Sequence, residues 1–175
     1  MSHFAFVSYS TTDLQWAKRV QSAIEVFGLK SFVAERDWHT GQDETQIMEA
    51  IRSAGVFVLV WSKAAADSEW VRHEVGAAAG ANVPVVILRL DGAPPLPPTK
   101  RSEKYADAQT DAFDALLKVQ SAVMLRYRQL AEIAHVAQAK EIEKERQAEQ
   151  QRQANQNVGM LLLGSVVTAA LMSKK

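Results

Sequence analysis

The chain has 175 residues, which is enough for one ordinary domain and an appendage. Twenty basic residues balance twenty acidic ones, so no net field draws the whole protein to nucleic acid or to an anionic membrane. There is no cysteine, which excludes disulfide frameworks, cysteine-based zinc sites and thiol nucleophiles. Hydrophobic residues make up 47% and charged residues 23%, which is typical of a globular rather than a disordered chain.

Four continuous apolar runs predict β-strands that are covered on both faces. They span residues 4–8, 31–34, 56–61 and 83–88, and none shows the strict polar alternation of a half-exposed strand. Helical patterns separate the runs, so the order is β-α-β-α-β-α-β. This order predicts an α/β fold with a parallel, doubly wound sheet.

The first predicted helix follows the first strand. Thr12 and Gln15 have the spacing of a capping box at its start, and Gly28 is a typical stop. Two further helices are predicted over residues 44–53 and 68–82, between the later strands. The first helix presents an apolar face made of Ala17, Val20, Ile24 and Phe27.

The composition changes after Asp91. Four prolines between residues 94 and 98 predict an exposed loop. Residues 105–107 are a weakly marked fifth strand, and residues 111–119 are predicted to form a helix. We therefore assign residues 1–120 to one α/β domain. A separate long helix over residues 121–157 has a heptad-spaced seam formed by Val123, Tyr127, Leu130, Ala134 and Ala137.

The last segment, residues 158–175, is apolar up to residue 172 and ends in two lysines. As a helix, residues 158–172 reach roughly 22 Å, which is less than the roughly 30 Å core of a bilayer. Flanking polar side chains that extend to the membrane surface can close part of that gap. The segment is thus a candidate membrane anchor, and the alternatives are a helix buried in an oligomer or one lying in the membrane interface. At the other end of the chain, the first ten residues lack the pattern of a signal peptide.

Glu74 is the best single catalytic candidate. It lies one helical turn after Trp70, among the apolar positions of the third predicted helix. A carboxylate on a core-facing stripe is costly unless it is paired or lines a cleft, and desolvation raises the pKa of such a group. The structural alternative is that Glu74 reaches water at the edge of the stripe, or pairs with Arg36 or Arg72.

The loop after the second strand is the second candidate for binding. Ligands of open parallel sheets bind beyond the carboxyl ends of the strands, where this loop begins. Trp38 can stack on an adenine or nicotinamide ring, or serve as an exposed contact for another protein. The four histidines do not share a ligand spacing, so we predict no metal site. A glycine-rich dinucleotide motif, a P-loop, a nucleophile elbow and a basic, aromatic nucleic-acid surface are all missing.

Three motifs in order resemble the Toll/interleukin receptor (TIR) domain family. Residues 6–10 with Asp13 resemble its first signature, and Arg36-Asp37 with Gly41 resembles its second. Residues 68–74 resemble the S-x-W-x-x-x-E pattern of members that cleave NAD. The resemblance covers about residues 2–119 and implies a flavodoxin-like TIR fold, followed here by a long helix and an apolar tail outside the family.

The resemblance implies cleavage of the nicotinamide–ribose bond of NAD, as in bacterial and plant members, by a hydrolase or ADP-ribosyl cyclase. NAD would be the substrate, and no cofactor is implied. Glu74 would hold the ribose and stabilise the oxocarbenium-like state. The family also implies activation by self-association, here through the TIR domain and the C-terminal helix, in a cytoplasmic domain used in defence or stress signalling. The implied substrate contacts are Ser8, Tyr9, Ser10, Arg36, Trp38 and Trp70.

Two other functions compete with NAD cleavage. A TIR domain can also be a non-enzymatic adaptor that recruits another TIR domain, but an adaptor does not need a carboxylate at Glu74. A phosphoacceptor receiver domain needs an acidic pair after the first strand and an Asp after the third strand. Ser10-Thr11 and Ser62 occupy those places, which argues against the receiver.

Overall fold

The computed structural model describes residues 4–33, 44–90, 92–95 and 102–172, with residues 102–105 and 157–172 described as backbone only. The chain divides into two units, Met1–Leu130 and Ala131–Lys175. The first unit contains the sheet, and the described residues of the second unit are all helical.

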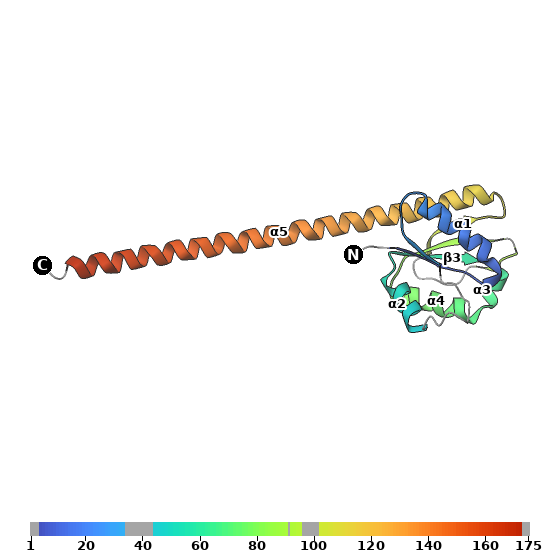
Figure 1. Cartoon of the computed structure of the whole chain (residues 1–175), viewed down its shortest axis with the longest axis horizontal. Coiled ribbons are helices and arrows are strands. Elements are labelled where there is room, and N and C mark those ends of the chain that lie inside the picture. Colours follow the sequence, from blue (N-terminus) through green and yellow to red (C-terminus); the bar gives the residue numbers. More distant parts are fainter. Residues whose placement is uncertain (1–3, 34–43, 91, 96–101, 173–175) are drawn as a thin grey trace. The chain divides into compact units, whose positions relative to one another are not determined.

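Five parallel strands form one sheet in the order β2-β1-β3-β4-β5 (Figure 1). The predicted parallel, doubly wound sheet is therefore confirmed, and its fifth strand is longer than the short pattern in the sequence indicates. The strands are β1 (Ala5–Ser8), β2 (Ser31–Val33), β3 (Val56–Trp61), β4 (Val85–Arg89) and β5 (Ser102–Asp107).

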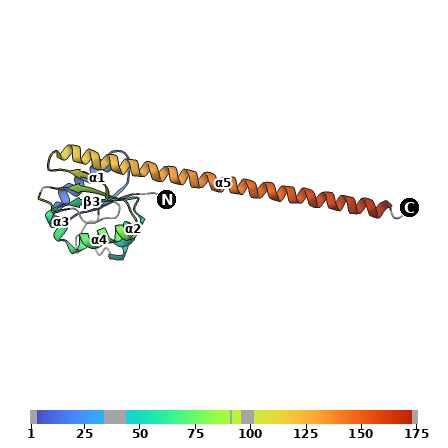
Figure 2. The same ribbon diagram turned by 180° about the vertical axis from the view of Figure 1, so that it is seen from behind.

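Helices cover both faces of the sheet, as both views show (Figure 1, Figure 2). One layer contains α1 and the beginning of α5, and the other contains α2, α3 and α4. The helical elements are the 3-10 turn η1 (Thr11–Asp13), α1 (Leu14–Glu25), α2 (Glu44–Ser53), α3 (Lys63–Asp67), α4 (Glu69–Gly80) and α5 (Ala112–Met172).

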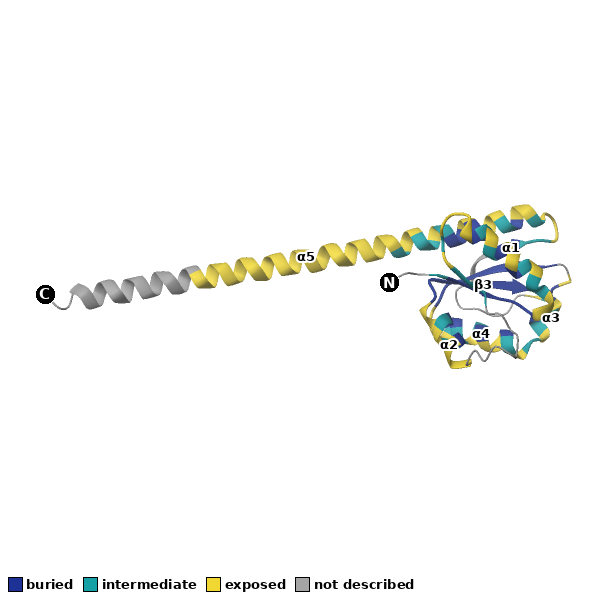
Figure 3. Ribbon diagram, viewed as in Figure 1, coloured by how far each residue is buried: buried dark blue, intermediate teal, exposed yellow. Residues whose placement is uncertain are grey.

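The core has two layers, one on each face of the sheet. Every residue of β3 is buried, as Figure 3 shows for the centre of the sheet. Burial on both faces explains why this strand consists only of apolar residues. Phe6 of β1 stacks between Phe32 and Phe57, with ring centroids 5.5 and 5.6 Å away, and so fixes β1 between its two neighbours.

The start of the first helix differs from the prediction. The turn η1 precedes α1, and the N-cap residue Asp13 makes no side-chain capping hydrogen bond, so the predicted capping box of Thr12 and Gln15 is wrong. The helix ends as predicted near Gly28, which has a φ of +71° that glycine adopts without strain. Phe27 does not join the apolar face and is 54% exposed, because it lies beyond the last helical turn.

Helix α3 was not predicted. It has only five residues, Lys63–Asp67, and too few positions to show a helical period. Its signal is local: the Ser62 hydroxyl accepts a hydrogen bond from the amide of Ala65 at 3.0 Å, as an N-cap does. The chain thus turns into α3 directly at the carboxyl end of β3.

The two predicted C-terminal helices form one continuous helix, α5. No proline or glycine lies between residues 112 and 158 to interrupt it. Gln120, at the expected break, is buried and donates from Nε2 to the carbonyl of Ala23 at 2.5 Å. The Tyr127 hydroxyl donates to the carbonyl of Lys30 at 2.9 Å. These bonds attach the beginning of α5 to α1 and to the residue before β2.

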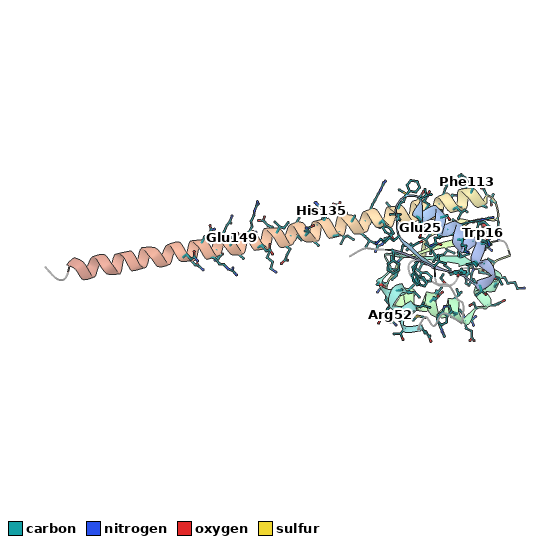
Figure 4. The ribbon with its side chains drawn as sticks, in the orientation of Figure 1. Trp16, Glu25, Arg52, Phe113, His135 and Glu149 are labelled. Atoms are coloured by element: carbon teal, nitrogen blue, oxygen red, sulfur yellow. The ribbon has the colours of Figure 1, made fainter. Side chains whose placement is uncertain are left out.

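In the second unit, every side chain that is described, over residues 131–156, is exposed (Figure 3). The seam positions Ala134 and Ala137 are therefore uncovered within a single chain. His135 and Glu149 point into solvent (Figure 4), and Ile133 is 61% exposed. The candidate anchor at residues 158–175 lies outside the residues with described side chains. Over the described part of the chain, no helix is both long and apolar enough to span a membrane.

Candidate functional site

The site is built around Glu74, in the middle of α4. Helix α4 begins at Ser68, whose hydroxyl caps it by accepting from the amide of Val71 at 3.3 Å. One turn later, the Trp70 indole Nε1 donates to Glu74 Oε1 at 2.8 Å. The spacing of four residues places both side chains on the same face of the helix.

Strand β1 supplies the second partner of Glu74. The Ser8 hydroxyl donates to Glu74 Oε2 at 2.5 Å, so each carboxylate oxygen accepts one of the two bonds. Ser8 is the last residue of β1, which lies between β2 and β3, and its side chain is fully buried. Ser8 lies on the same face of the sheet as Phe6, toward α4, because side chains alternate along a strand.

Glu74 has no exposed surface. It therefore does not reach water, which was one of the structural alternatives. The other alternative was an ion pair with Arg36 or Arg72. Arg72 does not form it, because Arg72 is exposed, donates to the carbonyl of Ala66 at 3.0 Å and lies 3.8 Å from Glu69. Hydrogen bonds from neutral donors reduce the cost of burying a carboxylate. Ser8 and Trp70 have this role toward Glu74.

The other predicted contacts are placed differently. Tyr9 is 2% exposed and packs in the layer of α1 and α5, on the opposite face from Glu74. Ser10 lies beyond the end of β1, is 7% exposed, and its hydroxyl lies 3.3 Å from that of Thr12. The structure brings Ser8, Trp70 and Glu74 together, and it does not bring Tyr9 to them. Arg36 and Trp38 lie outside the described residues.

A second, partly buried polar pair joins the turn after β1 to the end of β3. The Ser62 hydroxyl donates to Asp13 Oδ2 at 2.5 Å. Burial raises the pKa of the Asp13 carboxyl above its ordinary value, although the hydrogen bond from Ser62 acts in the opposite direction. No motif in the sequence pairs Ser62 with Asp13. Its signal was its place directly after a buried strand, where polar side chains of parallel sheets gather.

The chemistry available here is that of a fixed carboxylate. Ionised Glu74 can stabilise a positive charge that develops on a bound molecule or accept hydrogen bonds from sugar hydroxyls. Ser8 and Trp70 are neutral donors to this carboxylate. Among the residues that are described, His, Asp and Glu side chains form no group of three or more able to hold a metal ion.

Sequence comparison identifies a family. The family model described as "TIR domain" matches residues 5–119, which is more than half of the chain. No protein with a curated function matches.

Two solved TIR structures, of a Toll-related receptor and a TIR-STING receptor, agree with the fold. The TIR domain of the Toll-related receptor TRR-2 from Hydra magnipapillata is 18% identical, with a TM-score of 0.55 over 70% of this chain and 97% of that one. A metazoan TIR-STING receptor from C. gigas is 27% identical, with a TM-score of 0.53 over 68% of this chain and 41% of the receptor. The TIR domains of the activated Roq1 resistosome are 23% identical, with a TM-score of 0.45 over 51% of this chain and 58% of that one. The chain thus spans less than two thirds of two of these three relatives.

Proposed function

The chain belongs to the TIR domain family, and from this premise we propose that it cleaves the bond between nicotinamide and ribose in NAD, with Glu74 as the catalytic carboxylate. The observation that carries the proposal is the bonding of the Glu74 carboxylate to Ser8 at the end of β1 and to Trp70 in the first turn of α4. A carboxylate held by two neutral donors at this edge of the sheet suits a reaction that generates positive charge on a sugar.

The proposed reaction needs an ionised carboxylate rather than a proton donor. As the C–N bond breaks, its electron pair moves to the pyridinium nitrogen, and nicotinamide leaves as a neutral molecule. Positive charge develops on the ribose, where ionised Glu74 stabilises it. Water then adds to the anomeric carbon and loses a proton to give ADP-ribose. In the cyclase version, a nitrogen of the same adenine adds instead of water.

Four further side chains complete the proposed substrate contacts. Ser10 and the Trp70 ring border the position of the ribose, Trp38 stacks on a base, and Arg36 binds phosphate. We assign Ser8 to Glu74 rather than to NAD, because its buried hydroxyl is bonded to the carboxylate. Tyr9 is left out of the proposed contacts because it packs on the other face of the sheet.

The proposed activity depends on self-association. Glu74 has no exposed surface in the single chain, so NAD reaches it only after a rearrangement. Residues 131–156 of α5 are exposed along their whole length and offer a surface on which copies of the chain can associate. We propose that association through α5 and the TIR domain stabilises the open form, in a defence or stress response.

The test is NAD consumption by the purified chain over a range of protein concentrations, beside Glu74→Gln. Glutamine keeps the size and removes the charge; its carbonyl oxygen can still accept from the Trp70 indole, and its amide group can donate to the Ser8 hydroxyl, so the variant should remain folded. The expected result is NAD loss that rises more than linearly with native protein and is absent in the variant. Equal NAD loss by both proteins would assign the chemistry to another residue.

A second candidate function is a non-enzymatic TIR–TIR interaction module. The observation that favours it is the complete burial of Glu74, since two hydrogen bonds between α4 and β1 also suit a purely structural carboxylate. In that case no concentration of native protein consumes NAD, and Glu74→Gln lowers the melting temperature.

A further inference from the structure

The two donors to Glu74 differ in how firmly they are held. Ser8 is fully buried on a strand with hydrogen-bonded neighbours on both sides. Trp70 is partly exposed and lies in the first turn of α4. A buried residue of a central strand moves little, whereas a partly exposed side chain near a helix end changes rotamer more readily.

We propose that Ser8 is a fixed positioning residue for Glu74, and that the Trp70 indole is a displaceable donor whose place a ribose hydroxyl of the substrate takes. The inference rests on the proposed function. Ser8 and Trp70 donate to the same carboxylate but have different roles. The bond from Ser8 persists through catalysis, whereas the bond from Trp70 is replaced when the substrate binds.

The geometry supports the exchange at Oε1. With Glu74 fully buried, a sugar hydroxyl can reach the carboxylate only where a side chain that covers it moves away. Ser8 lies on the sheet side of the carboxylate, and only Trp70 of the two donors reaches the surface. A ribose hydroxyl is chemically equivalent to the indole N–H as a neutral donor, so the exchange leaves the carboxylate ionised and bonded on both oxygens.

The two residues therefore have different kinetic signatures. Removing the Ser8 hydroxyl leaves Glu74 misplaced in the transition state, so Ser8→Ala should lower kcat by about tenfold or more with little change in KM. Ser8→Thr keeps the hydroxyl on a residue suited to a strand and should restore most of kcat. Trp70→Phe keeps the ring and removes the donor that competes with substrate, so KM should fall while kcat is kept.

Ser62→Ala is the matched control. It removes another buried serine hydroxyl that donates to a carboxylate at 2.5 Å, but toward Asp13 instead of Glu74. Its effect on stability should resemble that of Ser8→Ala, while kcat and KM for NAD remain native. Melting temperatures of all variants identify any loss of folding.

A second measurement follows the exchange directly. In nuclear magnetic resonance of the full chain with isotope-labelled tryptophan, the Trp70 indole signal is the one missing from Trp70→Phe. Addition of ADP-ribose, which carries the ribose hydroxyls, should shift this signal in the native chain and in Ser8→Ala alike. A stationary Trp70 signal at saturating ADP-ribose would overturn the exchange.

The kinetic experiment distinguishes this inference from the proposed function. If native protein consumes NAD and Ser8→Ala does so with native kcat, the anchor role of Ser8 is wrong and the proposed function stands. If Trp70→Phe lowers kcat as Ser8→Ala does, Trp70 is a second positioning residue and the proposed replacement of its bond by a ribose hydroxyl is wrong. If native protein does not consume NAD at any concentration, the proposed function itself fails, and this inference with it.

Discussion

The Ser62 hydroxyl and the Asp13 carboxylate are joined by a 2.5 Å hydrogen bond that connects the carboxyl end of β3 to the turn after β1. The two residues are 49 positions apart in the chain. This pair joins the turn after β1 to the end of β3, beside the strand that carries Ser8. The pKa of Asp13 therefore depends on how these two segments pack.

The pair predicts a pH dependence of stability. Burial raises the pKa of Asp13 above the ordinary 3.8, so the folded protein binds a proton that the unfolded chain releases. The contribution of Asp13 to the free energy of unfolding is fully present below pH 3.8 and is lost as the pH rises through the pKa of Asp13 in the folded protein. Asp13→Asn should therefore gain stability relative to native as pH rises from about 3.8. Urea unfolding at a series of pH values measures this, and a constant difference across pH would contradict it.

Gln120 predicts a cost in stability. Its buried amide donates to the Ala23 carbonyl and attaches α5 to α1. Gln120→Ala should lower the free energy of unfolding by about 1–3 kcal/mol, because the carbonyl loses its partner in a buried place. Urea unfolding measures the change. The exposed Gln150→Ala serves as the control and should remain within about 0.5 kcal/mol of native.

Tyr127 should ionise late. Burial raises its pKa from 10.0 to about 12, and its hydroxyl donates to the Lys30 carbonyl. The neutral form is thus favoured in the folded state, and this stability is present below pH 10 and lost between pH 10 and about 12. Ultraviolet difference titration of native protein should show a tyrosine transition near pH 12 that Tyr127→Phe lacks. A transition of native size near pH 12 in Tyr127→Phe would contradict the assignment to Tyr127.

The exposed apolar side chains of α5 predict self-association. Ile133 and Ile142 are 61% and 54% exposed in the single chain, so their replacement by Gln costs little within one chain. The double replacement should weaken association in sedimentation experiments and leave the melting temperature of the dilute protein unchanged. Unaltered sedimentation would move the association surface elsewhere.

The inner strands were predictable because a strand covered on both faces is apolar throughout, and β3 and β4 show this pattern clearly. The edge strand β5 was only partly predicted because its sequence is polar. Glu74 stood out for the related reason that a carboxylate on an apolar helical face needs partners. Those partners were harder to assign. Ser8 was predicted to contact substrate, since nothing local distinguishes a hydroxyl that contacts a ligand from one that bonds to a carboxylate 66 positions away.

Other features depend on tertiary contacts that no local pattern records. The Asp13–Ser62 pair requires knowing that β1 and β3 are neighbours in the sheet. The continuity of α5 was missed because the predicted domain boundary was placed at residue 120, where the resemblance to the TIR family ends. In the fold, Gln120 is a buried contact of the helix with α1 rather than a break.

The central claim is tested most directly by following NAD itself in nuclear magnetic resonance, with concentrated native protein beside Glu74→Gln. The account predicts that the signal of the nicotinamide-bound ribose decays in the native sample, and that free nicotinamide appears in equal amount with ADP-ribose or its cyclic form. The Glu74→Gln sample should remain unchanged while circular dichroism shows it folded. Intact NAD in the native sample at every concentration would contradict the account and favour the interaction module.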